Sequence, residues 1–431
     1  MRHNIRIPNT KACFLRRFAA AESGAAAVLA AVLFPAIIGG IGLGSEAGYW
    51  YLKQRQLQHA ADLSAHAAGT RMRSGDSDAT LRTVAQRIAS KAGYTPQTGE
   101  LVVNTPPSDG DYASNPDAVE VQLTRQIPRM FSAIFSDAPV ALSADAVALI
   151  RDGNEACVLA LSGSASPAVK LSGSSLVELN GCDLASNSLA ADSVLMNGGS
   201  AALSAGCVYS VGEIVETTRL TLTECDSVKE YASVTRDPYA SVPEPTNLAS
   251  IPVSTQTSGE IDASYAYSEG VLALRFQGGL DFTGDTTLGP GLYIIDGGVL
   301  KANSGVTITG VGVTFFLANG ATVQLNGGAN LNLSPPTTGP YSGLTFFGSR
   351  SGGATTVHQV NGNAGSVVEG AVYFPTSKIM FSGNSKTSGG GGCTQVIGDT
   401  VELTGNSSLR STCQTSGTRD VLANRFVRLV E

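Results

Sequence analysis

The first strong pattern in the chain is an unbroken run of uncharged, mostly apolar residues near the N-terminus. The run covers residues 23–45, between Glu22 and Glu46, and contains the core AAAVLAAVLFPAIIGGIGLG. As an α-helix this run extends about 34 Å, which exceeds the ~30 Å hydrocarbon core of a bilayer. The pattern therefore predicts a transmembrane helix over residues 23–45, with the lipid bilayer as its partner.

The next hundred residues show helical and then strand periodicity. Residues 46–70 are predicted to continue the helix out of the membrane, and residues 78–93 to form a short amphipathic helix. Strand patterns follow at 101–103, 119–126 and 140–150. A long helix laid on a small antiparallel sheet predicts an α+β region over 46–150, with a plan analogous to that of pilins.

Three large apolar residues lie between the second and third predicted strands. They are Phe131, Ile134 and Phe135. Such a cluster either packs into the protein core or touches the membrane surface. We expect core packing, because large apolar side chains are most often buried.

Two short repeats run through residues 151–431 and predict the fold of this body. A six-residue pattern, apolar-x-apolar-[Ser/Thr/Asn]-Gly-x, starts at Val169, Val194, Leu280, Val306, Val323, Ile379 and Val401. A second pattern, glycine followed by an apolar strand, occurs as GLYII, GVTFF, GLTFF and GAVYF. Short strands closed by glycine turns favour a right-handed β-helix or solenoid, in which stacking buries the inward side chains. A β-sandwich is the alternative.

A proline-rich stretch interrupts the body. Residues 237–250 include the sequence DPYASVPEP. Proline and glycine punctuate local structure, so this stretch is predicted to divide the body. It separates a Cys-rich β-repeat region at 151–236 from a Gly-rich β-solenoid region at 251–431.

Composition agrees with an all-β body and excludes several classes of protein. Glycine makes up 50 of the 431 residues, about 12%, where about 7% is usual, and charged residues make up only 15%. The hydrophobic fraction of 42% is too high for a disordered chain. A net charge of −7 leaves no basic footprint of the kind that nucleic-acid binding needs, so no nucleic-acid partner is expected.

The charges that flank the apolar run predict its orientation. The first 17 residues contain five basic and no acidic side chains, at Arg2, Arg6, Lys11, Arg16 and Arg17. Because lysine and arginine stay on the cytoplasmic side, residues 1–22 are predicted to be cytoplasmic and the C-terminal part to be exported. The alternative is a signal peptide cleaved after Ala47, since Ser45 and Ala47 meet the small-residue rule. The apolar run exceeds the usual signal-peptide core, which favours an anchor.

The cysteines are consistent with export into an oxidising compartment. Six of the seven lie in the body, at Cys157, Cys182, Cys207, Cys225, Cys393 and Cys413. An offset of 25 residues superposes the first three of these on one another. Six cysteines allow 15 connectivities. We expect the pairs Cys157–Cys182, Cys207–Cys225 and Cys393–Cys413, with an exchange of Cys182 and Cys207 as the alternative.

Residues 18–69 combine the apolar span with a distinctive exit. Gly24 lies near the start of the span, Pro35 lies midway, and an aromatic exit leads into the run LQHAADLSA. In these features the segment resembles the TadG-like N-terminal module of Flp (Tad) pilus-assembly proteins. The motif residues are Leu57, Gln58, Ala61 and Asp62. The resemblance implies a single-pass protein of the bacterial inner membrane, with a periplasmic body and protein partners in a pilus or envelope assembly.

Two features of related pilus proteins are missing from the sequence. Some family members carry a von Willebrand A-type domain with a DxSxS metal site, and no such motif occurs here. No glycine lies five residues before Glu22, as a type IV prepilin cleavage site requires. Processing into a pilin subunit is therefore not expected.

The sequence contains no specific catalytic motif, and no metal or cofactor site is predicted. The nucleophile elbow G-x-S-x-G, the P-loop, the dinucleotide fingerprint and HExxH are all absent. Asp281 and Asp285 flank one repeat, and a carboxylate pair is what glycoside hydrolysis uses, but we expect solvated turn residues there. His358, the only histidine of the body, is expected in a surface loop.

These patterns favour a membrane-anchored structural protein of a Flp/Tad-type pilus assembly. Its β-rich body is expected to be an interaction surface rather than an enzyme. The first alternative is an envelope adhesin or glycan-binding protein, whose body contacts glycan. The second alternative is a carbohydrate-active β-helix enzyme.

Overall fold

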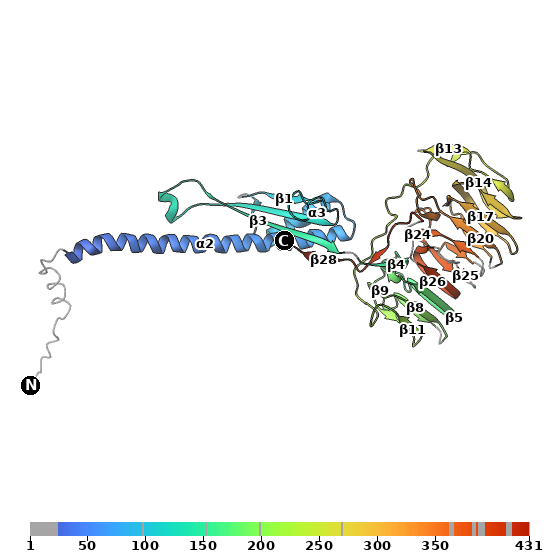
Figure 1. Cartoon of the computed structure of the whole chain (residues 1–431), viewed down its shortest axis with the longest axis horizontal. Helices are drawn as coiled ribbons and strands as arrows, with labels where there is room; N and C mark the ends of the chain where they lie inside the picture. The colour runs from blue at the N-terminus through green and yellow to red at the C-terminus, as the bar shows by residue number, and fades with distance from the viewer. Residues whose placement is uncertain are drawn as a thin grey trace, which may run out of the picture. The chain divides into compact units, whose positions relative to one another are not determined.

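The computed structural model describes residues 25–96, 99–151, 153–197, 200–268, 270–326, 328–361, 366–381, 385–386, 393–410 and 416–430. These residues form two compact units (Figure 1). We call the described residues of Met1–Met72, Ser77–Leu149 and Arg428–Glu431 the helix–sheet unit. Arg73–Asp76 and Ile150–Val427 make up the solenoid unit. The predicted cytoplasmic segment 1–22 lies outside the described residues.

Two helices and a four-stranded sheet form the helix–sheet unit. α2 (Ala25–Arg73) is a continuous helix of 49 residues, and α3 (Asp78–Lys91) follows it. The strand order is β1 (Leu101–Asn104), β2 (Ala118–Ile127), β3 (Val140–Arg151) and β28 (Phe426–Leu429). β1 and β3 both pair antiparallel with β2. Local patterns predict both helices and the first three strands, whereas β28 is a long-range addition from the other end of the chain.

The solenoid unit winds about ten coils, whose strands stack into three faces. The first face contains β4 (Asn154–Ala160), β6 (Asp183–Ser186), β9 (Val208–Ser210), β18 (Val313–Ala318), β21 (Leu344–Gly348) and the first parts of β14 (Val271–Phe282), β16 (Gly291–Ala302), β24 (Gly370–Phe381) and β26 (Thr394–Arg410). The second face contains β7 (Val194–Asn197), β10 (Ile214–Val215), β19 (Thr322–Leu325), β22 (Val357–Val360), the start of β5 (Val169–Asn180) and the later parts of β14, β16, β24 and β26. The third contains β8 (Ala202–Ala205), β11 (Leu220–Leu222), β12 (Gly259–Ile261), β15 (Thr286–Leu288), β17 (Thr307–Val311), β20 (Asn330–Ser334), β23 (Val367–Val368) and β25 (Ser385–Lys386). Successive coils pair in parallel, which makes the body a β-solenoid rather than a β-sandwich.

Three short elements complete the solenoid unit. β13 (Tyr265–Ser268) pairs antiparallel with β14 near one end of the stack. β27 (Leu422–Ala423) pairs antiparallel with β4. The 3-10 helix η3 (Leu248–Ser250) lies in the connection that precedes β12. Within the described part of the solenoid unit, β13 and β27 thus depart from the parallel pairing of the coils.

The order of the coils in space differs from their order in the sequence. β26, the last long strand of the chain, pairs in parallel with β24 and also with β4 and β5. The coils of residues 154–222 therefore stack on the end of the coils of residues 259–410. The proline-rich stretch 237–250 connects the far ends of the two stacks. The described residues of 151–236 and 251–427 consequently lie in one unit with a shared sheet.

The first face is buried on both sides, which explains the continuous apolar runs such as GVTFF. On the inner side, the Phe315 ring lies 5.8 Å from that of Tyr293 and 5.5 Å from that of Phe346. On the outer side, Phe316 and its neighbours pack in a second buried cluster with Tyr239. A strand that is buried on both faces has no polar side to alternate with. The other repeat, apolar-x-apolar, follows strands with one solvent side, such as β19.

The proline-rich stretch packs along the outside of the first face. We call residues 235–251 the return strap. The Tyr239 hydroxyl is buried and donates a hydrogen bond to Gln395 at 3.2 Å, and the Tyr373 hydroxyl donates to Asp237 at 2.8 Å. Burial raises the pKa of Tyr239 to about 12, so this hydroxyl stays protonated and can donate. The strap is thus a covering layer of the solenoid.

His358 is buried in β22, so its expected place in a surface loop is wrong. Only 2% of the residue is exposed, and its ring stacks on that of Phe374 at 3.7 Å. Its register partner is Ile379, a core residue, which puts His358 at an inward position. Burial lowers the pKa of His358 to about 4, so the imidazole is neutral at neutral pH. A polar side chain at an inward position cannot be recognised before the register is known.

Two disulfides link neighbouring segments of the Cys-rich region 151–236. Cys157 pairs with Cys182, and Cys207 pairs with Cys225, as expected from the sequence. The separation of 25 residues in the first pair is one coil of the solenoid, because β4 and β6 are neighbours in the first face. Cys413 lies outside the described residues, so the Cys393–Cys413 pair stays a prediction.

Candidate functional site: the membrane helix and its docking surface

The N-terminal half of α2 carries large apolar side chains on every side. Val28, Leu29, Val32, Leu33, Phe34, Ile37, Ile38 and Ile41 are each more than half exposed. Among the described residues, Ala27–Arg73 is the one helix long and apolar enough to cross a membrane. A helix that is apolar all round needs a lipid or protein environment, and the described part of the chain leaves these side chains largely exposed. The geometry therefore matches the predicted span at this end of the helix.

The C-terminal half of α2 buries one face made mostly of small residues. Leu57, Ala60, Ala61, Ser64, Ala65 and Ala68 are each at most 2% exposed. This face lies toward the sheet, because the Gln54 amide donates to the carbonyl of Ser143 in β3 at 2.6 Å. Alanine combines strong helix propensity with a small side chain, so it permits a close approach of helix and sheet.

The sequence motif at residues 57–62 supplies the central contacts of this docking surface. Leu57 and Ala61 are buried, and the Gln58 amide donates to the carbonyl of Asp145 in β3 at 2.8 Å. Gln58 also donates to the Asp62 carboxylate at 2.9 Å, one helical turn away. Asp62 thus orients the amide that binds the sheet. These residues form a structural joint between the membrane helix and the sheet.

Glu46 belongs to the candidate site, although in the sequence it only marks the end of the apolar run. Its carboxylate accepts hydrogen bonds from the backbone N–H of Met130 at 2.7 Å and of Ser132 at 2.6 Å. Burial raises the pKa of Glu46, but these hydrogen bonds and the nearby Arg129 outweigh it, and the pKa lies below its usual value. An acidic residue directly after a membrane span was the signal available in the sequence.

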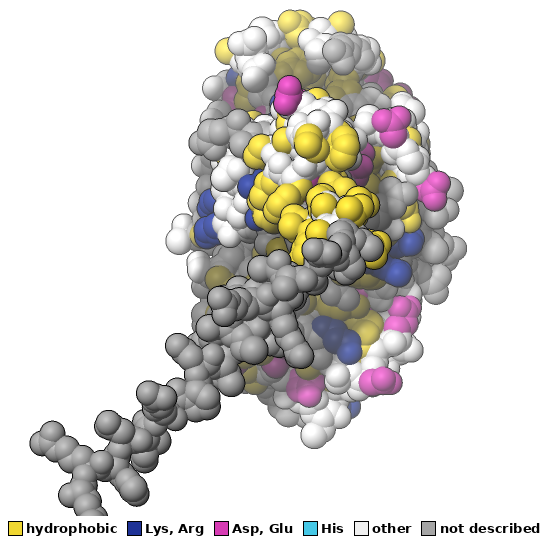
Figure 2. Space-filling model, turned by 90° about the vertical axis from the view of Figure 1, so that its left-hand side faces the viewer, with side chains coloured by type: hydrophobic (Ala, Val, Ile, Leu, Met, Phe, Trp, Pro, Cys, Tyr) yellow, Lys and Arg dark blue, Asp and Glu magenta, His cyan; other side chains and the backbone are white. Residues whose placement is uncertain are grey.

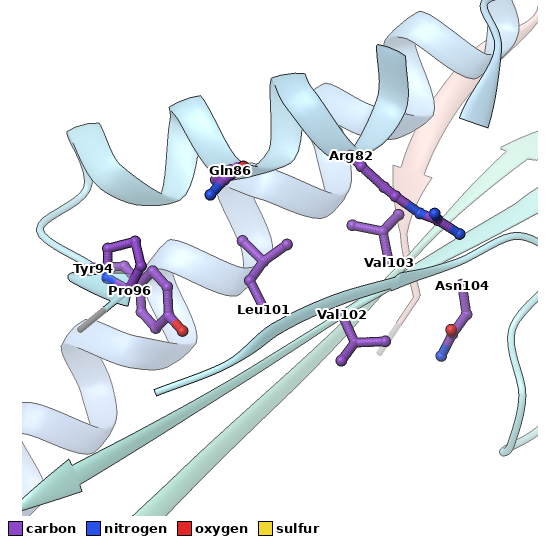
Figure 3. Close-up of a pocket in the computed structure, with 8 residues that line it drawn as sticks. All are labelled: Arg82, Gln86, Tyr94, Pro96, Leu101, Val102, Val103 and Asn104. Atoms are coloured by element: carbon purple, nitrogen blue, oxygen red, sulfur yellow. The ribbon is translucent and has the colours of Figure 1, made fainter. Parts of the chain in front are cut away.

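A cavity of about 400 Å³ lies between α3 and β1, the edge strand of the sheet (Figure 3). Its lining residues are Arg82, Gln86, Tyr94, Pro96, Leu101, Val102, Val103 and Asn104. The Tyr94 hydroxyl is buried and makes no hydrogen bond within the described protein. Burial raises the pKa of Tyr94, so the phenol is neutral. The lining offers hydrogen bonds and apolar contact, with no pair of a nucleophile and a base.

The carboxylates considered for catalysis take part in contacts between coils. Asp281 lies 3.5 Å from the Lys301 ammonium and accepts a hydrogen bond from Asn303 at 3.1 Å. Asp285 accepts the backbone N–H of Thr307 at 2.8 Å. All three partners belong to the next coil, so both carboxylates link neighbouring coils. Within the described ranges, no group of three or more His, Cys, Asp or Glu side chains is placed to hold a metal ion.

A charged column crosses the seam where the two stacks of coils meet. The Glu402 carboxylate of β26 lies 3.1 Å from the Lys170 ammonium of β5 and also pairs with Lys378 of β24. Burial raises the pKa of Glu402, but the two lysines outweigh it and lower the pKa below its usual value. The ionised carboxylate therefore bridges three coils.

Replacing Glu402 by glutamine should destabilise the solenoid at about pH 7 by roughly 1–3 kcal/mol, because two half-buried lysines lose their counter-charge. Because the folded pKa of Glu402 is lowered, this contribution is present above the ordinary carboxyl pKa of about 4.5. It disappears as the pH falls through the lower folded pKa. Urea unfolding of the detergent-solubilised chain at several pH values measures the difference. The exposed Glu178→Gln on β5 is the control, and an equal loss in both variants would contradict the prediction.

Several residues singled out in the sequence lie outside the described part of the chain. They are Arg16, Arg17, Glu22, Gly24 and Cys413. Pro35 lies inside α2, and the helix continues through it. The orientation that the basic residues predict for the membrane helix therefore stays a prediction.

The described geometry defines a protein with one membrane-type helix, a small sheet docked on that helix and a β-solenoid body. Residues 24–71 match the family model described as Putative Flp pilus-assembly TadE/G-like. The match confirms the resemblance drawn from residues 18–69, and it covers the apolar span and the docking motif. No curated protein and no solved structure is significantly similar to the chain.

Proposed function

We propose that this chain is a membrane-anchored structural component of a Flp/Tad-type pilus assembly and that it performs no catalysis. The observation that carries the proposal is the family match over residues 24–71. The matched segment includes the residues that join the membrane helix to the sheet, among them Gln58. The role we assign to this segment is therefore to hold the sheet of the helix–sheet unit at a fixed distance from the bilayer.

The solenoid unit is, in this proposal, an exported surface for protein partners. A stack of about ten coils presents long faces with regular spacing, which suits contact with an extended assembly. Disulfides such as Cys157–Cys182 favour an oxidising compartment, which in a bacterium is the periplasm. The five basic residues before the span favour a cytoplasmic N-terminus.

The location is tested by protease accessibility of a C-terminally tagged chain in intact cells and in spheroplasts, with carbonate extraction of the membranes. We expect a full-length, carbonate-resistant protein that protease cuts only in spheroplasts. A shortened, soluble product would mean cleavage after Ala47 and would contradict the anchor. Cleavage in intact cells would place the body at the cell surface and favour an adhesin.

The assembly role is tested by deletion of the coding sequence and a count of surface pili. We expect pili to be lost, to return with the full chain and not to return with a chain that lacks residues 151–427. Normal piliation after deletion would refute the pilus role. Saturable binding of glycan by the reconstituted full chain would instead support the adhesin alternative.

A further inference from the structure

An apolar cluster lies at the end of the β2–β3 hairpin. η2 (Phe131–Ile134) closes this hairpin. We call Met130, Phe131, Ile134 and Phe135 the hairpin tip; their exposed fractions are 52%, 53%, 83% and 76%. The expectation that Phe131, Ile134 and Phe135 pack in the core is therefore wrong. Strand pairing ends at Ile127 and Val140, so the tip extends past the sheet that would have covered it.

The tip lies against the apolar part of α2. A β-carbon at Gly42 would be only 2.7 Å from the Phe131 ring, so the ring occupies the space that a side chain would fill. Gly42 precedes Glu46 by four residues, about 6 Å along the helix axis. Phe131 therefore contacts α2 inside the stretch that matches the predicted span. Figure 1 shows the hairpin running back alongside α2 toward its N-terminal end.

Glu46 holds the tip at this level. Its carboxylate binds the backbone N–H groups of Met130 and Ser132, which flank Phe131, and it also accepts the Ser132 hydroxyl at 3.1 Å. Hydrogen bonds to an ionised carboxylate are about twice as strong as those between neutral groups. The turn is thus tied to the point where the apolar part of α2 ends.

The base of the tip carries the groups that prefer the membrane–water interface. The Arg129 guanidinium lies over the Trp50 ring at 5.6 Å and donates to the carbonyl of Ala138 at 2.8 Å. Tryptophan is enriched at the headgroup level, and arginine pairs with lipid phosphates. Trp50 lies four residues beyond Glu46, on the side away from the span. The hairpin and the helix therefore change from polar to apolar in the same direction.

We propose that the hairpin tip inserts into the lipid leaflet where α2 leaves the bilayer, as a second membrane contact of the helix–sheet unit. The occupant of this surface is lipid, because the tip is continuous with the exposed apolar side chains of α2 through the Phe131–Gly42 contact. Figure 2, which faces this end of the structure, shows hydrophobic side chains grouped there. One helix alone leaves a unit free to rotate and tilt, whereas two contacts fix its orientation on the membrane. The proposal rests on the anchoring of α2 and adds a docking element to it.

The test measures the depth of a tryptophan at the tip in the reconstituted full-length chain. Trp50 is the only tryptophan, so Ile134→Trp in a Trp50→Phe background places one reporter at the most exposed tip position. The protein is inserted into phosphatidylethanolamine and phosphatidylglycerol vesicles that contain lipids brominated at defined acyl-chain depths. We expect quenching that is strongest with bromine near the headgroup end of the chain. Two controls use the same background: Ile38→Trp in the span and Arg87→Trp on the exposed side of α3.

The outcomes separate failure of the tip from failure of the anchor. Ile38→Trp should be quenched most by deep bromines, and Arg87→Trp should not be quenched. If only Ile38→Trp is quenched, the tip proposal is overturned while the anchor stands. If neither Ile134→Trp nor Ile38→Trp is quenched, the anchoring of α2 fails as well. Emission at the tip that shifts with protein density in the vesicles, without quenching by bromine, would mean that a second copy or another protein covers the tip, and it would also overturn the proposal.

Discussion

Replacing Phe315 by alanine should lower the free energy of unfolding of the solenoid unit by about 3–5 kcal/mol, the cost of removing a large aromatic side chain from a packed core. Phe315 is 1% exposed and lies in the middle of the inner aromatic column, between the rings of Tyr293 and Phe346. The neighbouring coils cannot close the cavity, because the parallel ladders of β18 to β16 and β21 hold their spacing. The substitution therefore loses both the buried area and the ring contacts.

The measurement is urea unfolding of the detergent-solubilised full-length chain, followed by circular dichroism. Val311→Ala on β17 is the matched control, because Val311 is 76% exposed and its truncation should change stability by less than about 0.5 kcal/mol. The loss of unfolding free energy for Phe315→Leu should fall between the losses for Phe315→Ala and Val311→Ala. A loss for Phe315→Ala no larger than that of the control would show that this column is not the core of the solenoid.

Placing two arginines in the span, as Ile37→Arg with Ile38→Arg, should abolish carbonate-resistant attachment to the membrane. Each arginine near the centre of a membrane helix costs about 2.5–3.5 kcal/mol on the insertion scale, and each lost isoleucine adds a few tenths. Both positions are more than half exposed, so the described protein does not enclose the new charges. The chain should then appear in the carbonate supernatant or be degraded.

The control for this variant lies on the same helix beyond the apolar half. Leu63 and His66 are exposed on the part of α2 that docks the sheet, and Leu63→Arg with His66→Arg should leave attachment unchanged. Carbonate extraction of both variants, with immunodetection of a C-terminal tag, compares them directly. Full retention of the Ile37→Arg/Ile38→Arg chain would mean that another part of the protein holds it in the membrane.

Local periodicity was sufficient for most elements of the fold. The apolar run before Glu46 predicted the exposed half of α2, and the two repeats predicted a stack of short strands. The repeats differ for a physical reason: runs such as GVTFF belong to a face buried on both sides, whereas alternating segments such as β19 have one solvent side. Both patterns depend on residues that are close together in the sequence, so they can be recognised without the structure.

The candidate site could be predicted only in part from the sequence. The motif around Gln58 was recognised by its resemblance, but its action on the carbonyl of Asp145 joins residues 87 apart. The contacts of Glu46 were not predicted, and the prediction that the tip packs in the core was wrong, for the same reason. Whether Phe131 is buried depends on where β2 and β3 stop pairing and on the gap that Gly42 leaves in α2. None of these distances follows from the residues themselves.

Local spacing in the sequence predicted a membrane-type helix, the strands of a small sheet and a β body of short strands closed by glycine turns, because each of these patterns lies within a short stretch of chain. The tertiary structure decided the order of the coils, the covering role of the return strap and the exposure of the hairpin tip. The seam between the two stacks shows why: β26 pairs with β5, and this pairing joins Glu402 to Lys170, more than two hundred residues apart in the sequence. A repeat specifies the shape of one coil, whereas the identity of its neighbour depends on contacts that only the folded chain brings together.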